Sequence, residues 1–334
     1  MTLSLLIPTQ NDYDDAHGDT SQEVVYREKI ATLNEQRDAT TQKLTHPWKF
    51  ETVDGFFKQS RPETDDLVFN YATENFGRTM SWPDIVTKLQ QLNESANSNE
   101  CYKLLFLARH GQGYHNLCVE KYGVEQWATK WHNMETDGEI IIGPDPMLTP
   151  LGVDQAKENN QVWKQEIDSG APIPSKFYVS PLQRSCRTLV GTWTGIKPED
   201  KDPHPLVVES LRETLGVNIC DKRSPRSVIS ERFSKHGFVI DDSVTEFDEL
   251  YTETKRETLS EQSIRVNGFL QRIFDEDWDG SSLDKSKQLE HQFISTTSHA
   301  GTIRAFITVV GHRKFTISTG GMIPIVVKAT RSLD

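Results

Sequence analysis

The feature that most constrains the fold is a short apolar run at residues 102–108, which ends in Arg109, His110 and Gly111. Such a run is typical of a strand buried on both faces, as in a parallel sheet. Gly111 permits a sharp turn and a close backbone approach. Open α/β sheets bind ligands at the carboxyl ends of their strands. The run therefore predicts a central strand with an arginine and a histidine at a ligand site, the alternative being a strand end with two solvated side chains.

Other short apolar segments alternate with helical ones along the chain. We expect helices to begin near Ser81, Thr149, Ser180 and Thr258, and the first three of these residues are plausible caps. The predicted strands are residues 176–179, 206–209, 292–296 and 323–329, and the predicted helices include 82–92, 181–193, 258–274 and 302–310. This alternation predicts an α/β fold with right-handed crossovers and a mostly parallel sheet.

The domain organisation follows from changes in composition. Residues 1–45 are polar and are predicted to form an N-terminal extension, with a helix at 21–42. Residues 46–334 are expected to form one domain. Within it, residues 216–255 are charged and lack periodicity, and we interpret them as an irregular insertion over the carboxyl edge of the sheet.

Composition limits the classes of function. The chain has 334 residues and a net charge of -12, which disfavours a general nucleic-acid binder. No apolar stretch approaches 18 residues and no signal peptide is expected, so we expect no membrane partner and a cytoplasmic location, with access to the nucleus left open. The four cysteines are expected to be reduced thiols. An anionic substrate would have to be attracted by arginines gathered at one point.

Four predicted strand ends bear polar groups of a coherent kind. They are Arg109 with His110, Arg184 with Arg187 one turn later, Glu213, and His299. Arginines and histidines that converge near helix N-termini make a site for a dianion, most simply a phosphoryl group. A neutral histidine can attack phosphorus, and His110 is the candidate. Glu213 is the candidate acid for the leaving group, with Glu209 as its rival.

These motifs, in this order, resemble the histidine phosphatase (phosphoglycerate mutase-like) superfamily. The matching segments are Arg109-His110-Gly111 with Asn116, Leu148 to Gly152, Ser180 to Thr188, Leu211 to Glu213, and Ser298 to Ile303. Segments around Trp48, Gly55 and Gly113 resemble the fungal phosphomutase-like proteins. The resemblance covers about residues 100–330.

The resemblance implies a three-layer α/β/α sandwich and a set of roles. His110 would be the phosphorylated nucleophile and Glu213 the proton donor. The phosphate pocket would comprise Arg109, Arg184, Asn116 and His299, although Asn116 could equally cap a helix. Two further residues, Arg187 and Gly113, are candidate substrate contacts, although Arg187 could equally form a surface ion pair. Arg187 and Ala300 depart from the common family pattern, and the lack of aspartate after His299 argues against the acid phosphatase branch.

Three functions fit this pattern. The first is a metal-independent phosphomonoester hydrolase that acts through phosphohistidine on a small phosphorylated metabolite, without a cofactor. The second is a phosphomutase that uses the same residues. The third is a catalytically silent phosphate-binding regulatory protein. No pair of histidines has the spacing of zinc ligands, and the sequence does not indicate an oligomeric state.

Overall fold

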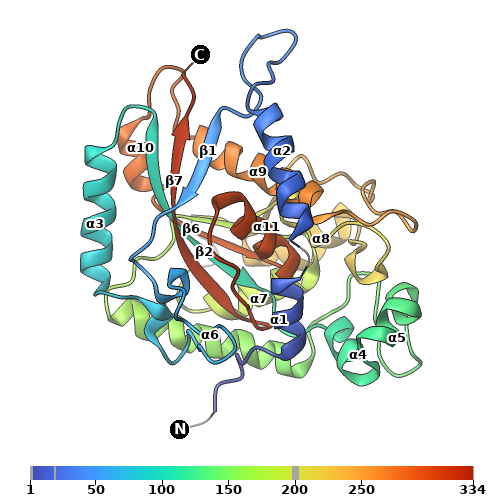
Figure 1. Ribbon diagram of the computed structural model, residues 1–334. Helices are drawn as coiled ribbons and strands as arrows, with labels where there is room; N and C mark the ends of the chain where they lie inside the picture. Colours follow the sequence, from blue (N-terminus) through green and yellow to red (C-terminus); the bar gives the residue numbers. More distant parts are fainter. Residues whose placement is uncertain (1–2, 19, 198–202, 334) are drawn as a thin grey trace.

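A seven-stranded sheet lies at the centre of the computed structural model, which describes residues 3–18, 20–197 and 203–333 (Figure 1). The strand order is β1-β7-β2-β6-β3-β4-β5. The strands are β1 (Trp48–Thr52), β2 (Glu100–Arg109), β3 (Lys176–Val179), β4 (Leu206–Val207), β5 (Val239–Ile240), β6 (Phe293–Ser298) and β7 (Met322–Arg331). β2, β6, β3, β4 and β5 are parallel, whereas β7 is antiparallel to both of its neighbours. The predicted α/β fold with a mostly parallel sheet is confirmed.

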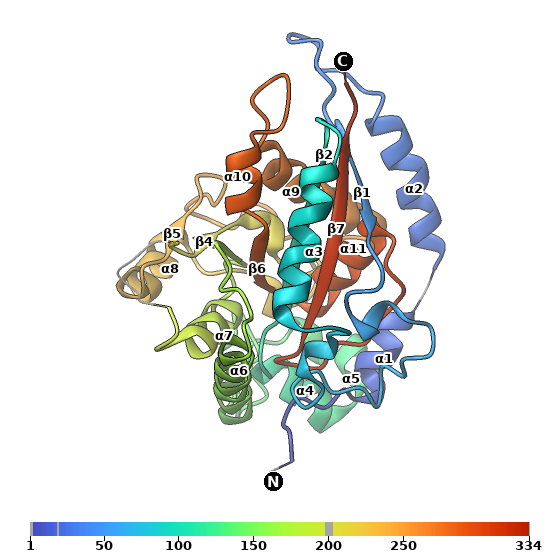
Figure 2. The ribbon, with the colours of Figure 1, turned by 90° about the vertical axis from the view of Figure 1, so that its left-hand side faces the viewer.

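Helices cover both faces of the sheet, which gives three layers (Figure 2). One face bears α3 (Trp82–Ser95), α6 (Pro150–Asp168) and α7 (Gln183–Trp193), and the other bears α2 (Ser21–Leu33), α9 (Leu259–Asp275) and α11 (Ala300–Val310). On β3, the Phe177 ring lies 4.8 Å from Trp193 of α7, and the adjacent Tyr178 ring lies 5.1 Å from Phe269 of α9. Since neighbouring strand residues point to opposite faces, both sides of the sheet are packed.

The ends of the helices agree with the predicted caps at most positions. Thr149 accepts a hydrogen bond from Gly152 N at the start of α6, and Ser81 accepts one from Asp84 N at the start of α3. The prediction that a helix begins at Pro181 is wrong by two residues, because α7 begins at Gln183. The Ser180 hydroxyl instead accepts a hydrogen bond from Leu182 N within the preceding turn.

Two other predictions need correction. The strand expected at 206–209 is only two residues long, because the chain turns into a 3-10 helix at Glu209–Leu211. The insertion at 216–255 is not irregular throughout, since it contains α8 (Arg226–Phe233) and the strand β5, which extends the sheet beside β4. Pairing of β5 with β4 joins residues more than 30 positions apart, so no local pattern indicates it.

The N-terminal segment forms two helices, α1 (Gln10–His17) and α2. The helix expected at 21–42 ends at Leu33. Tyr26 is buried, and its hydroxyl accepts a hydrogen bond from Asn267 Nδ2 of α9 at 3.1 Å. α1 lies beside α11 near the carboxyl edge of the sheet (Figure 1). The segment is thus packed against the layer that contains His299 and α11.

The remaining helices are peripheral. They are α4 (Tyr114–Tyr122), α5 (Val124–Thr129) and α10 (Lys285–Glu290). Within the described ranges, no helix combines the length and the apolar character needed to cross a membrane. The four cysteines are buried free thiols.

Candidate active site

His110 lies directly after β2 at the carboxyl edge of the sheet. Its side chain is 2% exposed, and its ring lies 5.0 Å from the His299 ring, centroid to centroid. Nδ1 is 2.6 Å from Gly111 O, and Nε2 is 3.3 Å from the Nε donor of Arg184. Both contacts require the same tautomer, with the proton on Nδ1. The lone pair of Nε2 therefore faces the arginine.

The turn after β2 requires glycine at position 111, because the backbone of α6 lies very close to it. A Cβ at position 111 would overlap the backbone of Gly152. Gly111 N donates to Thr188 Oγ1 of α7 at 2.9 Å, and that hydroxyl donates to Arg184 O at 2.8 Å. The turn after β2 is thus fixed between α6 and α7, as the close approach predicted at Gly111 requires.

Arg184 is fully buried in the first turn of α7. Its Nη1 donates to Cys220 O at 2.8 Å, and its Nη2 donates to Asp221 Oδ1 at 2.9 Å. Cys220 and Asp221 belong to the insertion, so this segment holds the arginine from the side opposite His110. The three nitrogen atoms fix the guanidinium plane, with Nε directed at the histidine.

His299 lies at the N-cap of α11, immediately after β6. Its Nε2 is 2.7 Å from the Ser180 hydroxyl and 3.4 Å from the Ser185 hydroxyl, and its Nδ1 has no hydrogen-bond partner among the described residues. β6 pairs in parallel with both β2 and β3. Because the carboxyl ends of these strands share one edge, His110, Arg184 and His299 meet there.

Arg109 is the last residue of β2, and its side chain points toward α1. Nη1 donates to Asp12 Oδ1 at 2.5 Å and to Ile317 O at 2.6 Å. Nε is buried without a partner among the described residues. The residue is 7% exposed. A buried arginine donor of this kind is suited to an oxyanion.

Glu213 is half-buried beside the first turn of α11. Its Oε1 accepts from Thr214 N at 2.8 Å, and its Oε2 accepts from Gly301 N at 3.3 Å. Glu209, the rival proton donor, accepts instead from Arg212 and Arg223, with Arg212 Nη1 at 2.8 Å from Oε1. The Glu213 carboxylate therefore lies beside α11, the helix that begins after His299. Glu209 instead forms ion pairs with two buried arginines.

The other three candidates lie in different settings. Asn116 Oδ1 accepts from Gly113 N at 2.9 Å, which is the helix-capping role that the sequence leaves open. A Cβ at Gly113 would lie 2.7 Å from the His115 ring and 3.5 Å from Arg184 Cδ, so this glycine packs against the site. Arg187 is exposed, with its guanidinium 5.9 Å from the Phe233 ring of α8. The structure does not bring Arg187 to the histidines.

Burial sets the protonation of the histidines. It lowers the pKa of His110 and of His299 well below the usual range, and the nearby Arg184 lowers both further. His115, whose ring lies 5.4 Å from that of His110, has its pKa lowered by the same two causes. His110 is therefore a neutral base at neutral pH, as an attacking nitrogen must be.

Several residues at the site were not predicted from the sequence. Asp12 contacts Arg109, Asp221 contacts Arg184, and Ser180 contacts His299. Arg265 of α9 donates to the backbone oxygens of Ser210, Arg212 and Glu213 and so fixes the loop of the carboxylate. Two of these residues have a local signal: Asp12 forms a capping-box pattern with Thr9, and Ser180 begins one of the motif segments. In the part of the chain that the structure describes, no cluster of three His, Cys, Asp or Glu side chains could hold a metal ion.

Comparison with known proteins identifies relatives along most of the chain. No family model matches it. It is 35% identical to a probable phosphoglycerate mutase of Arthroderma benhamiae, over 85% of this chain and 86% of that protein. It is 34% identical to phosphomutase-like protein 3 of Candida albicans, over 84% of this chain and 80% of that protein. It is 32% identical to a probable phosphoglycerate mutase of Saccharomyces cerevisiae, over 69% and 80% of the two chains.

These relatives and the site agree with the resemblance noted in the motifs. The two histidines and Arg184 meet at one edge of the sheet, with Arg109 and Glu213 beside them. The chain therefore belongs to the phosphoglycerate mutase-like proteins of the histidine phosphatase superfamily, and it is an enzyme of the phosphatase and phosphomutase type.

Proposed function

We propose that the protein is a metal-independent phosphomonoesterase that acts through a phosphohistidine on a small phosphorylated metabolite. The observation that supports this most directly is His110, a neutral buried imidazole whose Nε2 lone pair faces Arg184 Nε at 3.3 Å. Two other buried nitrogens near it, Arg109 Nε and His299 Nδ1, have no partner among the described residues. Arg109 Nε is a donor, and His299 Nδ1 is a donor in the tautomer whose Nε2 accepts from the Ser180 hydroxyl. Buried donors without partners fit an oxyanion.

The first step is attack of His110 Nε2 on phosphorus. The new N–P bond forms as the bond between phosphorus and the leaving oxygen breaks, and Glu213 gives its proton to that oxygen. The charge on the phosphoryl oxygens is neutralised by Arg109 and Arg184, and His299 contributes hydrogen bonding. In the second step, Glu213 takes a proton from water as the water attacks phosphorus. The N–P bond then breaks, which restores neutral His110 and releases phosphate.

Hydrolysis requires that water reach the leaving-group side. Glu213 is half-buried, so its side chain is partly accessible to solvent. A carboxylate that solvent can reach favours transfer of the phosphoryl group to water.

Replacement of the nucleophile tests the proposal. We expect His110→Ala to lower kcat for p-nitrophenyl phosphate by about a thousandfold or more, because the covalent route is lost. Acid-quenched wild-type protein should contain acid-labile phosphate, and His110→Ala should not. Equal turnover by the two proteins, or a phosphoenzyme formed by the variant, would contradict the assignment.

A phosphomutase is the second candidate, because two relatives are named probable phosphoglycerate mutases. The same residues would transfer the phosphoryl group back to the substrate. Incubation with 2- and 3-phosphoglycerate separates the two activities. Free phosphate without the other isomer supports the phosphatase, whereas isomer formation in excess of free phosphate supports the mutase.

A further inference from the structure

α1 contributes a carboxylate to the phosphate pocket. Asp12 lies 97 positions before Arg109 in the sequence, so only the fold brings the two side chains together. They are 11% and 8% exposed, and Asp12 Oδ1 and Arg109 Nη1 are 2.5 Å apart. The same nitrogen donates to Ile317 O at 2.6 Å. Both hydrogens of Nη1 are therefore used by the protein.

The other edge of the guanidinium is left for a ligand. Arg109 Nε is buried with no partner, and Nη2 donates no hydrogen bond to any of the described residues. An oxyanion accepts two parallel hydrogen bonds from one edge of a guanidinium. We propose that Asp12 is a positioning residue that, with Ile317 O, fixes the Arg109 plane so that its Nε and Nη2 atoms face the phosphoryl group. The inference rests on the proposed function.

Asp12 is itself held by the start of its helix. Its Oδ2 accepts from Thr9 N at 2.9 Å and from Thr9 Oγ1 at 2.8 Å, and Thr9 Oγ1 accepts from Asp12 N. This is a capping box. One carboxylate oxygen therefore caps α1 while the other faces Arg109, so the cap sets the orientation of the carboxylate.

Both ends of α1 are attached to the domain. The segment before it is held by Glu158 of α6, which accepts from Ser4 Oγ at 2.6 Å and from Leu5 N at 2.7 Å. At the other end, His17 Nε2 lies 2.7 Å from Asp66 Oδ2. Asp66 also accepts from Thr316 N at 2.7 Å, next to the residue whose carbonyl binds Arg109. The helix and the 316–317 segment are thus fixed together.

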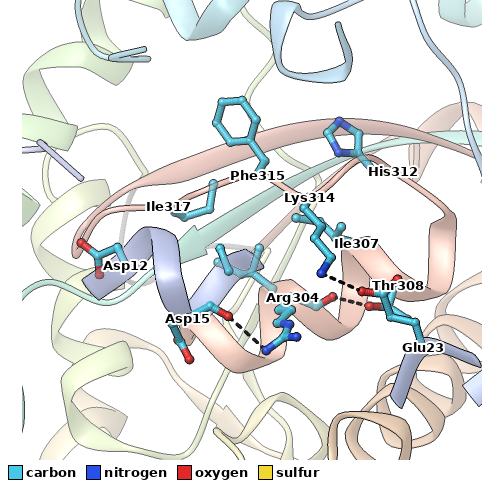
Figure 3. A pocket seen from close by; sticks show the side chains of 13 residues that line it. Asp12, Asp15, Glu23, Arg304, Ile307, Thr308, His312, Lys314, Phe315 and Ile317 are labelled. Carbon is cyan, nitrogen blue, oxygen red and sulfur yellow. Dashed lines mark hydrogen bonds and ion pairs between the residues drawn. The ribbon is translucent and has the colours of Figure 1, made fainter. Parts of the chain in front are cut away.

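The middle of α1 is held by α11. Asp15 O accepts from Arg304 Nη1 at 3.0 Å, and Figure 3 shows Asp12 on α1 near Ile317, with Asp15 beside Arg304. A small cavity lined by these residues and by Ile307 and Phe315 lies between the two helices. The position of α1 therefore depends more on these polar contacts than on apolar packing along the helix.

The opposite role for Asp12, competition with phosphate for Arg109, predicts effects of opposite sign. A carboxylate that competed with phosphate for Arg109 would weaken binding, so its removal would tighten phosphate affinity. A carboxylate that positions Arg109 strengthens binding. Asp12 binds only Nη1 of Arg109, so phosphate can bind the Nε–Nη2 edge without displacing the carboxylate. This arrangement favours the positioning role.

Asp12→Asn is the sharpest test, because Asn keeps an oxygen for Thr9 but turns its amide donor toward Nη1. We expect the dissociation constant of inorganic phosphate, measured by calorimetry, to rise about tenfold, with a similar rise in KM for p-nitrophenyl phosphate. The matched control is Asp14→Asn on the same helix, whose side chain is exposed and bonds Gln10. The control should match wild type. Unchanged or tighter phosphate binding by Asp12→Asn would overturn the proposal.

A double-mutant cycle with Arg109→Ala shows whether the effect passes through the arginine. If Asp12 acts by positioning Arg109, Asp12→Asn should change phosphate affinity little in the Arg109→Ala background. A full additional loss there would overturn positioning in favour of a general effect on structure. Thr9→Ala, which leaves the carboxylate but removes its cap, should give a smaller loss of the same sign. If wild type binds phosphate but hydrolyses no phosphomonoester, the proposed function is wrong. The phosphate affinities of wild type and Asp12→Asn still test the role of Asp12 in that case.

Discussion

At the scale of single residues, the position of Glu213 depends on the absence of a side chain at Gly301. Oε2 accepts from Gly301 N in the first turn of α11, and a Cβ at 301 would overlap the carboxylate. The same Cβ would lie 2.8 Å from Thr214 Oγ1. The carboxylate is the movable partner, so a methyl group there displaces the proposed proton donor and leaves the helix intact.

We expect Gly301→Ala to separate activity from stability. Alanine favours a helix over glycine by about 1 kcal/mol, so the free energy of unfolding should not fall by much. The kcat should fall about tenfold for an alkyl phosphate and less for p-nitrophenyl phosphate, whose leaving group needs no proton. Gly268→Ala in α9, where nothing lies within 4 Å of the new Cβ, is the control and should keep full activity. Equal losses for both substrates would argue against Glu213 as the acid.

The residues that follow strands could be predicted because a parallel sheet brings its carboxyl ends to one edge. His110 and His299 each follow a buried strand, and the structure places their rings 5.0 Å apart. Asp221 could not be predicted in the same way, because its contact with Arg184 is made by an insertion without periodicity. Arg187 shares a helix with Arg184 but is exposed and lies near the Phe233 ring, so its contact with the substrate stays a prediction.

At the scale of elements, β2 contains a lysine that is completely buried. Lys103 Nζ pairs with the Asp277 carboxylate, which also lies 2.5 Å from His291 Nδ1, and donates to His291 O at 3.0 Å. Both charged side chains are 0% exposed. This cluster ties the loop after α9 to the central strand. The apolar pattern of β2 predicts the strand, but it does not indicate that a lysine at its start requires a partner from a distant loop.

Removal of one partner should therefore be costly. We expect Asp277→Asn to lower the free energy of unfolding by about 3–5 kcal/mol, because Lys103 would remain as a buried charge without its counterion. Asp154→Asn removes a partner of Lys157 in a pair with side chains 67% and 56% exposed, and should cost about 0.5 kcal/mol or less. Urea unfolding of the two variants measures the difference. Equal losses would show that burial does not set the strength of the Lys103 pair.

At the scale of the whole molecule, the topology at the carboxyl edge differs from a simple repeat of crossover units. β7 is antiparallel to β2 because residues 311–321 return to the carboxyl edge before the strand begins, where Gly321 O accepts from Arg109 N at 2.8 Å. This return places Ile317 O beside Arg109. The last strand was predicted from its apolar pattern, whereas its direction depends on this extended connection, which has no periodic pattern.

The cluster of buried histidines makes global stability depend on pH. Burial, with Arg184 nearby, holds the pKa of His110, His115 and His299 well below the usual value. In the unfolded chain a histidine titrates near pH 6.5. As pH falls below about 6.5, the unfolded chain therefore binds protons that the folded protein does not, and folding stability decreases. The free energy of unfolding is therefore highest above this pH. It falls progressively as the pH is lowered toward the low pKa of these histidines in the folded protein.

We expect the free energy of unfolding, measured with urea, to fall between pH 7 and pH 5.5, with each of these histidines contributing up to about 1.4 kcal/mol per pH unit. His115→Gln tests this, because His115 lies beside the site, is 8% exposed and has an Nδ1 atom without a partner among the described residues. The slope for the variant should be smaller by up to about 1.4 kcal/mol per pH unit, whatever its stability at pH 7.5. The same slope in both proteins would show that His115 takes up its proton in the folded state, and so that the cluster is not held neutral by burial.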